Sequence, residues 1–446
     1  MIEACVHEVR RYVADHLDRF VVELGQLLTI PSGAFEPGSL DEAARWLAAM
    51  VRALGFTVEL IPGYGPPVVL ARRQGTGGGT VLFYGHYDVQ PPGRSEDWTT
   101  PPFVPTVRDG RIFARGSGDN KGQLFAHLKA VEALDAVGCR PRPTVCLLFE
   151  GEEEIGSPHI ERFVREQRSR LESDLLVIAD GQNFFAPLPL VGLGIRGLLC
   201  VRLALDGPRR VLHSGNYGGL VENPALSLIR LVASIQAEGG PIAFPGFSEG
   251  LIAESTAVEG GEDYPFDLQQ LVADVGGTAL TTDVADLGRK MAFEPVLNVS
   301  SFHAGEEGRT NIPSAAVATI DFRLVYNQDP QSIFTALSRF LLAKRPGLRR
   351  DLLRSLRPSR ACTEHPSVGM LIRHMAIAAG RKPLVMQSLG CSGPDRIFQE
   401  DLNVPVVRVP YGDKDTRSHS NDESFSLRAL SEGIVTSAAA ILAVGN

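Results

Sequence analysis

Residues 80–92 read TVLFYGHYDVQPP, a short apolar run with a histidine and an aspartate directly after it. The run is typical of a buried strand, and two similar runs, at 144–149 and 175–179, also end in acidic residues. Helical patterns such as 122–137 alternate with these strands, which predicts an α/β sheet with helices on both faces. Open α/β sheets bind ligands beyond the carboxyl ends of their strands. We therefore expect the polar residues that follow these runs to share one site.

The pattern changes after about residue 193. Residues 198–205 and 315–325 have the alternation of amphipathic strands, with helical segments between and after them. From about residue 365 the helix and strand patterns of the first part return. The sequence therefore predicts a catalytic domain, with a mostly parallel sheet flanked by helices, that is interrupted by an inserted α+β domain. The predicted ranges are 1–192 and 364–446 for the catalytic domain and 193–363 for the insertion.

Composition excludes several classes of protein. The net charge of −8 is mild and spread along the chain, so we expect neither nucleic acid nor an anionic membrane as partner. The first 29 residues are amphipathic, and no stretch approaches the roughly 20 apolar residues of a membrane span. The six cysteines form no CxxC pair, which predicts reduced, mostly buried thiols and no disulfide framework. These features predict a soluble, cytoplasmic protein.

Five short segments hold the residues suited to chemistry. In chain order they are GHYDVQP (85–91), RGSGDNKG (115–122), EGEEEIGS (150–157), VIADG (177–181) and SHSNDES (418–424). A two-metal hydrolytic site needs nitrogen and oxygen ligands for each ion, a bridging carboxylate and an unligated carboxylate as base. Each segment alone has an ordinary explanation, because acidic runs are usually solvated and Asp-Asn-x-Gly sequences form turns. The acidic run, however, follows directly on an apolar strand, where charge is costly unless something compensates it.

In these segments, and over nearly its whole length, the chain resembles the metallopeptidase family of carnosine dipeptidases, glutamate carboxypeptidase, aminoacylase and succinyl-diaminopimelate desuccinylase. The segments occur in the family's order and at its spacing. The resemblance implies two divalent metal ions, with zinc expected first and manganese or cobalt as alternatives. It implies that His86 and Asp180 hold one ion, that Glu154 and His419 hold the other, and that Asp119 bridges them.

The resemblance also assigns the acidic run. The family pattern Glu-Gly-x-Glu-Glu-x-Gly-Ser makes Glu153 the general acid/base and puts Glu152 at the variable position, where a structural role is expected. Asp88 would orient the imidazole of His86 as a hydrogen-bond partner behind the metal.

The insertion resembles the family's lid and dimerisation domain. His213, in LHSGNYGG, matches a lid histidine that reaches the active site of the partner subunit in dimeric members. Arg323, in TNIPSAAVATIDFRLVYNQDP, matches a substrate-binding arginine, and Asn311 is expected to line the same pocket. Two positions depart from the dipeptidase branch. Val211 stands where an aspartate is usual, and Gly390–Pro394 reads Gly-Cys-Ser-Gly-Pro where the branch has Gly-Gly-Ser-Ile-Pro. Gly390 and Ser392 of this loop are predicted substrate contacts.

These observations predict a metal-dependent hydrolase that cleaves the amide or peptide bond of a small substrate. The segments GHYDVQPPG, LHSGNYGG and FRLVYNQDP look most like the dipeptidase branch, so a dipeptide is the first expectation and an N-acyl amino acid the alternative. The resemblance further implies a homodimer through the lid domain. Two other classes stay open at this point: a non-catalytic scaffold, which should lack a ligand or the base, and a hydrolase that uses Cys391 as nucleophile, which should survive a chelator.

Overall fold

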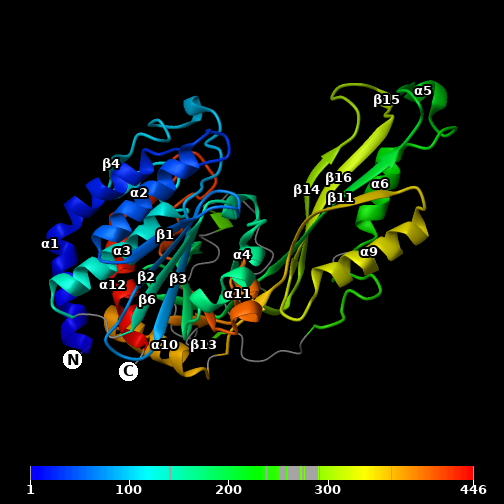
Figure 1. Cartoon of the computed structure of the whole chain (residues 1–446). Helices are drawn as coiled ribbons and strands as arrows, with labels where there is room; N and C mark the ends of the chain where they lie inside the picture. The colour runs from blue at the N-terminus through cyan, green and yellow to red at the C-terminus, as the bar shows by residue number, and fades with distance from the viewer. Residues whose placement is uncertain are drawn as a thin grey trace.

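The structure, a computed structural model, describes residues 2–139, 143–236, 240–251, 258–259, 272–273, 276, 290, 292–362 and 364–444. Two domains lie side by side, with both chain termini on the same one (Figure 1). The larger holds a nine-stranded sheet and the smaller a four-stranded sheet. The predicted α/β class is therefore confirmed. Among the described residues no helix is long and apolar enough to cross a lipid bilayer.

Three of the five motif segments lie at the ends of central strands of the large sheet. Its spatial order is β1 (Thr57–Ile61), β2 (Val68–Arg73), β6 (Thr144–Glu150), β3 (Thr80–His86), β7 (Leu175–Ile178), β20 (Val406–Arg408), β9 (Leu190–Gly192), β19 (Leu384–Met386) and β13 (Val258–Glu259). The four neighbours from β6 to β20 are parallel. Their carboxyl ends therefore meet at one edge, as the sequence predicted.

Side chains alternate between the two faces along each strand, so these apolar strands present apolar side chains on both faces. Helices cover both faces and bury these side chains. Val81 and Phe83 face five helices: α1 (Ile2–Leu28), α2 (Ser39–Ala53), α3 (Lys121–Ala136), α10 (Pro366–Ala379) and α12 (Leu427–Ala443). Leu82 and Tyr84 face α4 (Ile160–Glu166) and α11 (Asp395–Leu402). Residues on both faces are fully buried, which explains the continuous apolar runs of these strands.

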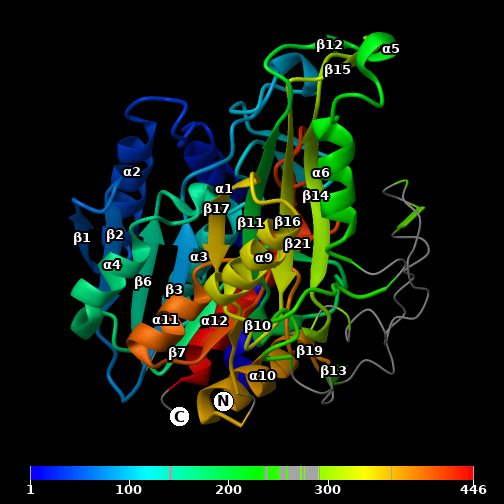
Figure 2. The same ribbon diagram turned by 90° about the vertical axis from the view of Figure 1, so that its right-hand side faces the viewer.

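The smaller domain, hereafter the lid, is a sheet with helices on one face (Figure 2). Its strand order is β14 (Val296–His303), β16 (Ala315–Leu324), β11 (Gly197–Asp206) and β17 (Arg349–Leu356). Leu199, Val201 and Leu203 pack against α6 (Pro224–Ala233) and α9 (Pro330–Lys344). The alternate residues, including Leu198 and Cys200, therefore lie on the opposite face.

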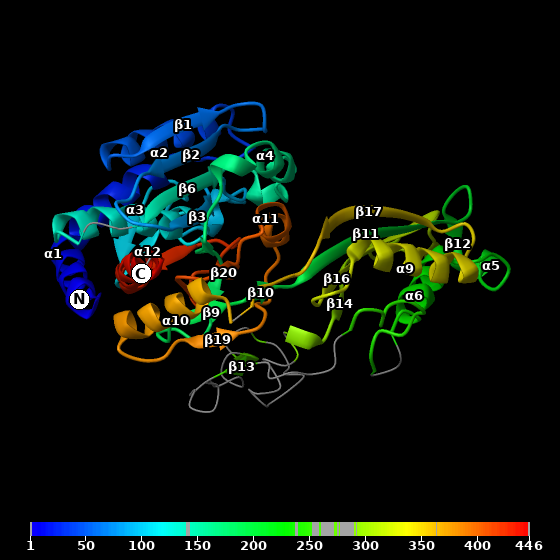
Figure 3. The same cartoon turned by 60° about the horizontal axis from the view of Figure 1, so that its bottom comes forward.

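A short strand pair joins the two domains (Figure 3). β10 (Gly194–Ile195) enters the lid and pairs with β18 (Ser359–Arg360), where the chain returns. We propose this pair as the domain boundary, close to the predicted 193 and 363, although residue 363 itself lies outside the described residues. Not all of the insertion belongs to the lid, because β13 joins the edge of the large sheet through β19.

Smaller elements complete the chain. The remaining strands and helical turns are β4 (Thr106–Arg108), β5 (Arg111–Phe113), β22 (Ser424–Ser426), β8 (Gln182–Asn183), β21 (Gly412–Asp413), β12 (Leu212–His213), β15 (Asn311–Ile312), α5 (Ser214–Tyr217), η1 (Ser95–Asp97), η2 (Glu153–Ile155) and η3 (Arg168–Arg170).

The prediction that all cysteines are reduced is wrong for one pair. Cys5, near the start of α1, is bonded to Cys139, which follows α3, with their Cα atoms 6.1 Å apart. The two are 134 residues apart in sequence, and only the packing of α1 against α3 brings them together. Spacing along the chain carries no sign of such a pair. Cys146, Cys200, Cys362 and Cys391 are free.

Candidate metal centre

Five predicted metal ligands meet at the carboxyl edge of the large sheet. His86 ends β3, Glu154 lies in η2 just after β6, and Asp180 follows β7. Asp119 lies just before α3 and is joined to Asn120 by a cis peptide bond. His419 lies in the loop before β22. They form two groups of possible ligands that share one residue: His86, Asp119 and Asp180 form one group, and Asp119, Glu154 and His419 form the other.

The distances place Asp119 between the groups. His86 Nε2 lies 3.2 Å from Asp119 Oδ1 and 4.0 Å from Asp180 Oδ1. On the other side, His419 Nε2 lies 3.2 Å from Asp119 Oδ2 and 3.1 Å from Glu154 Oε2. Each oxygen of one carboxylate thus faces a different imidazole, which is the arrangement of a carboxylate that bridges two ions.

These residues suit divalent cations. His86 Nε2 is buried without a hydrogen-bond partner, although a carboxylate oxygen lies nearby, and an orphaned imidazole nitrogen is costly unless a metal takes it. Hydrogen bonds to Asp119 and Glu154 raise the pKa of His419 to about 10. The same negative field attracts metal ions. Histidine nitrogen and carboxylate oxygen are ligands for zinc, and the carboxylate-rich set also accepts manganese.

Asp88 ties His86 to the acidic segment. The Nδ1 atom of His86 lies 3.1 Å from the Asp88 carbonyl oxygen and 3.3 Å from its Oδ1. The Asp88 carboxylate also accepts hydrogen bonds from the backbone N–H groups of Glu153 and Glu154, at 3.2 and 3.0 Å. One buried carboxylate therefore fixes an imidazole ring and the backbone of η2 together.

The four glutamates of the acidic run have different surroundings. Glu150 is buried and accepts hydrogen bonds from Tyr84 and Ser157, while Glu152 pairs with His159 at 2.7 Å. Glu153 lines the cavity beside the candidate metal ligands, and burial raises the pKa of its carboxyl group well above the ordinary value. A poised, unligated carboxyl next to a hydrolytic site is suited to proton transfer.

Two buried charged pairs hold the ligands and were not predicted. Arg408, at the end of β20, donates to Asp180 at 2.9 Å and makes two further bonds to the buried Asp395. Glu423 pairs with Arg115 at 2.7 Å and accepts a hydrogen bond from the backbone N–H of Asp119. Arg115 and Glu423 lie inside two of the motif segments, so their place in those segments was the available signal. Arg408 lies in no motif segment, and its only sequence signal was a charged residue within an apolar strand.

Residues from both domains line the cavity beside these groups. The cavity, of about 300 Å³, is lined by metal-site residues, by the segment Cys391–Pro394 and by lid strands β11, β16 and β17. Arg323 donates a hydrogen bond to Ser392 Oγ at 3.1 Å. Gly390 is exposed at the start of the loop. Burial raises the pKa of the Cys391 thiol to about 11, so it stays protonated and is poorly suited as a nucleophile.

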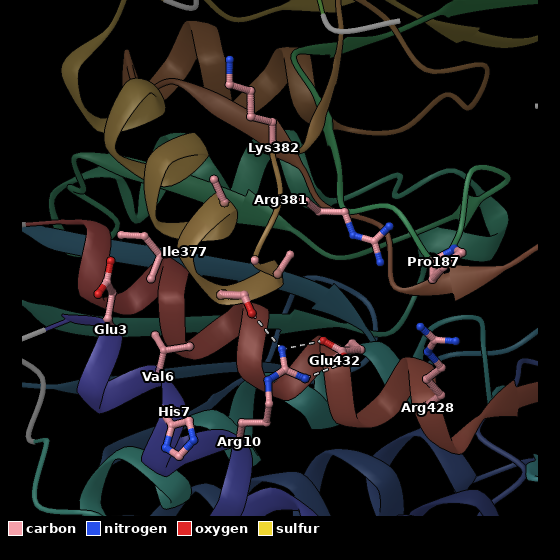
Figure 4. A pocket seen from close by; sticks show the side chains of 14 residues that line it. Glu3, Val6, His7, Arg10, Pro187, Ile377, Arg381, Lys382, Arg428 and Glu432 are labelled. Carbon is pink, nitrogen blue, oxygen red and sulfur yellow. Dashed lines mark hydrogen bonds and ion pairs between the residues drawn. The ribbon is translucent and has the colours of Figure 1, made fainter. Parts of the chain in front are cut away.

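His213 and Asn311 lie away from this cavity. They pair with each other across β12 and β15, and Figure 1 shows this region at the far end of the lid. Neither residue lines the metal cavity of its own chain. A second hollow, of about 790 Å³, opens between α1, α10 and α12, where Arg10 bonds to Glu432 and to the Ala378 carbonyl (Figure 4). It contains none of the predicted site residues.

Comparison with known proteins identifies the family of this chain. The sequence pattern of "Peptidase family M20/M25/M40" matches residues 82–443. The human Beta-Ala-His dipeptidase is 26% identical over 96% of this chain and 91% of its own length. The Cys-Gly metallodipeptidase of Schizosaccharomyces pombe is 26% identical over 94% of both chains.

Solved structures give the same result. An M20-family metallo-carboxypeptidase from Sulfolobus solfataricus has a TM-score of 0.84 at 28% identity, covering 95% of this chain and 98% of its own. Human carnosine dipeptidase 1 has a TM-score of 0.84 at 25% identity, covering 98% of both chains. The family match spans well over half of the sequence and includes all five metal-ligand candidates. This chain belongs to peptidase family M20/M25/M40 and is a metal-dependent hydrolase.

Proposed function

We propose that this enzyme hydrolyses dipeptides at a site for two divalent metal ions, for which zinc is the first expectation. The observation that carries the proposal is the shared carboxylate: Asp119 faces both imidazoles, with the unligated Glu153 in the same cavity. His86 and Asp180 would hold one ion, Glu154 and His419 the other, and Asp119 both. When bound, the ions lower the pKa of a shared water and polarise the scissile carbonyl.

The residues of the chain supply the remaining chemistry. Glu153 takes the proton of the attacking water and delivers it to the leaving amine. Asp88 keeps the His86 ring oriented throughout. Arg323 and Ser392 bind the carboxylate of the substrate, and Gly390 begins the loop that positions Ser392. Dipeptidase names among the relatives favour a dipeptide over an N-acyl amino acid.

The test is a metal analysis followed by a substrate screen. Dipeptides and N-acyl amino acids are compared with and without a chelator, in the wild type and in Glu153→Gln. We expect dipeptide hydrolysis that needs metal, and a loss of several orders of magnitude in Glu153→Gln with metal content retained. Turnover by Glu153→Gln near the wild-type rate would refute the role of Glu153. Activity confined to N-acyl amino acids would refute the dipeptide assignment.

We further propose a homodimer in which His213 and Asn311 serve the partner's cavity, His213 by stabilising the oxyanion. The support is their distance from their own cavity, together with exposed apolar residues on the lid: Val299 on the edge strand β14 and Leu226 and Ile229 on α6 are about half exposed. Co-expressed His213→Ala and Glu153→Gln chains should recover about a quarter of wild-type activity, because each hybrid dimer rebuilds one complete site. No recovery from hybrid dimers would count against the exchange.

A cytoplasmic location is the last part of the proposal. The four free cysteines are compatible with a reducing compartment, whereas the Cys5–Cys139 bond would be unusual there. Thiol labelling of the protein after cell fractionation tests both points. Recovery from an oxidising compartment would contradict the proposed location.

A further inference from the structure

The metal cavity contains a second guanidinium group besides that of Arg323. Arg354, on β17, lines the same cavity as Glu153 and Glu154. Arg323 lies opposite Leu198 of β11, and Arg354 lies opposite Cys200 of the same strand. Both arginines are therefore on the lid face that is free of helices, with the central strand β11 between them.

Arg354 contacts the backbone of the acidic segment of the larger domain but has no carboxylate partner among the described residues. Its Nη2 lies 3.5 Å from the carbonyl oxygen of Glu154, at the outer limit of a hydrogen bond, and that oxygen also accepts from Gln90 at 3.2 Å. Among the described residues no ion pair involves Arg354. By contrast, Arg349 at the far end of the same strand pairs with Asp206, and Arg357 just beyond the strand pairs with Glu400.

The two arginines are spaced for two groups on one small substrate. They stand on strands two places apart, which puts their backbones about 10 Å apart across the sheet. Two residues of extended chain span about 7 Å, and the side chains of arginine and glutamate cover the rest. If the C-terminal carboxylate lies at Arg323 and Ser392, the residue that supplies the scissile carbonyl extends toward Gln90 and Arg354.

Charge balance points the same way. Four carboxylates line the cavity, and two divalent ions would offset them. Arg323 lies 3.8 Å from Asp321 but also faces the cavity, and the charge of Arg354, which has no ion pair among the described residues, is left for the substrate. An ordinary dipeptide has one carboxylate for these two cations, whereas a substrate with a second carboxylate satisfies both.

We propose that Arg354 binds a carboxylate on the acyl half of the substrate, so that the enzyme prefers an acidic residue or a dicarboxylic acyl group on that side. The inference rests on the proposed function. The inference adds a specificity-determining residue to the proposed function and names the substrate class.

The experiment compares near-isosteric substrates that differ in charge. We measure kcat and KM for Glu-Ala against Gln-Ala, and for Ala-Glu against Ala-Gln, in the metal-loaded enzyme. In the wild type, Glu-Ala should exceed Gln-Ala about 10- to 100-fold in kcat/KM, the range expected for a charge-assisted bond. In Arg354→Gln the ratio should fall close to one, mainly through a higher KM for Glu-Ala.

Arg357→Gln is the matched control, because Arg357 lies just beyond the same strand and pairs with Glu400 outside the cavity. It should keep the wild-type ratio, and unfolding midpoints of both variants should match the wild type. N-succinyl-alanine serves as the second arm: its hydrolysis would identify a dicarboxylic acyl group, and hydrolysis of Glu-Ala an acidic residue.

Three results would overturn the inference: a wild-type ratio near one, an equal loss in Arg357→Gln, or a charge preference confined to Ala-Glu. Dipeptide hydrolysis without a charge preference would leave the proposed function standing. Absence of hydrolysis of any dipeptide or succinyl substrate would refute both.

Discussion

Replacing Arg408 by methionine should damage both the fold and the metal centre. Its side chain is 1% exposed and makes three hydrogen bonds to two carboxylates, at 2.8–2.9 Å. Methionine fills much of the volume but leaves Asp395, itself 1% exposed, without its partner. It also removes the hydrogen bond to Asp180 Oδ2, while Asp180 Oδ1 keeps its bonds from Asn120 and from the Gly181 N–H.

The two effects have separate magnitudes. Breaking a buried pair by removing one partner costs about 3–5 kcal/mol of unfolding free energy. Losing the group behind a metal-ligating carboxylate lowers metal affinity about 10- to 100-fold. Urea unfolding in chelator measures the first effect, and competition with a metal indicator measures the second.

Two further variants make the reasoning refutable. Arg396→Met removes an exposed pair with Glu400 and should cost less than about 1 kcal/mol with metal affinity unchanged. The double variant Asp395→Leu/Arg408→Met removes both buried charges, so it should regain stability but not metal affinity. Wild-type metal affinity in Arg408→Met would show that Asp180 does not depend on this arginine.

Three more outcomes follow from the structure. Removing metal with a chelator should destabilise the fold, by about 4 kcal/mol for each proposed ion present at a thousand times its Kd, which thermal unfolding with and without metal checks. Burial lowers the pKa of His127 to about 3. Below about pH 6.5 the unfolded chain therefore binds a proton at His127 that the native state does not bind. The free energy of unfolding falls as the pH falls from about 6.5 toward 3, by about 2 kcal/mol at pH 5. His127→Gln should remove that part of the slope in urea unfolding at pH 7 and 5. Gly122→Ala would put a Cβ 2.0 Å from the Ser117 carbonyl oxygen and should destabilise the turn that holds Asp119, whereas Gly369→Ala, with open space around it, should be neutral or stabilise by up to about 1 kcal/mol in the same unfolding assay.

The catalytic domain could be predicted from the sequence because its strands are buried on both faces. The run at 80–84 became the first part of β3, and the run at 144–149 became β6. The lid was harder to predict. β17 reads RRDLLRSL, with four charged residues in eight, and its burial is correspondingly slight. Such an edge strand has no apolar alternation, so Arg354 went unrecognised.

Contacts between residues far apart in sequence could not be predicted either. Arg408 and Asp180 are 228 residues apart, and Cys5 and Cys139 are 134 apart. No local pattern announces either pair, because each depends on how whole elements pack. The residues of the two candidate ligand groups could be singled out in spite of similar separations, because each lies in a short motif of fixed spacing.

The β10–β18 pair has a consequence for how such an enzyme can change. The chain leaves the catalytic domain before Gly197 and returns after Leu356 through two strands that are hydrogen-bonded to each other, and within this range β13 rejoins the large sheet. Closing a loop whose ends are pinned costs little entropy, whatever its length. The five predicted metal ligands lie outside this range, while Arg323 and Arg354 lie within it. The predicted metal ligands and the two lid arginines thus lie on separate stretches of chain, so substitutions in the lid strands can change the arginines without changing a predicted ligand.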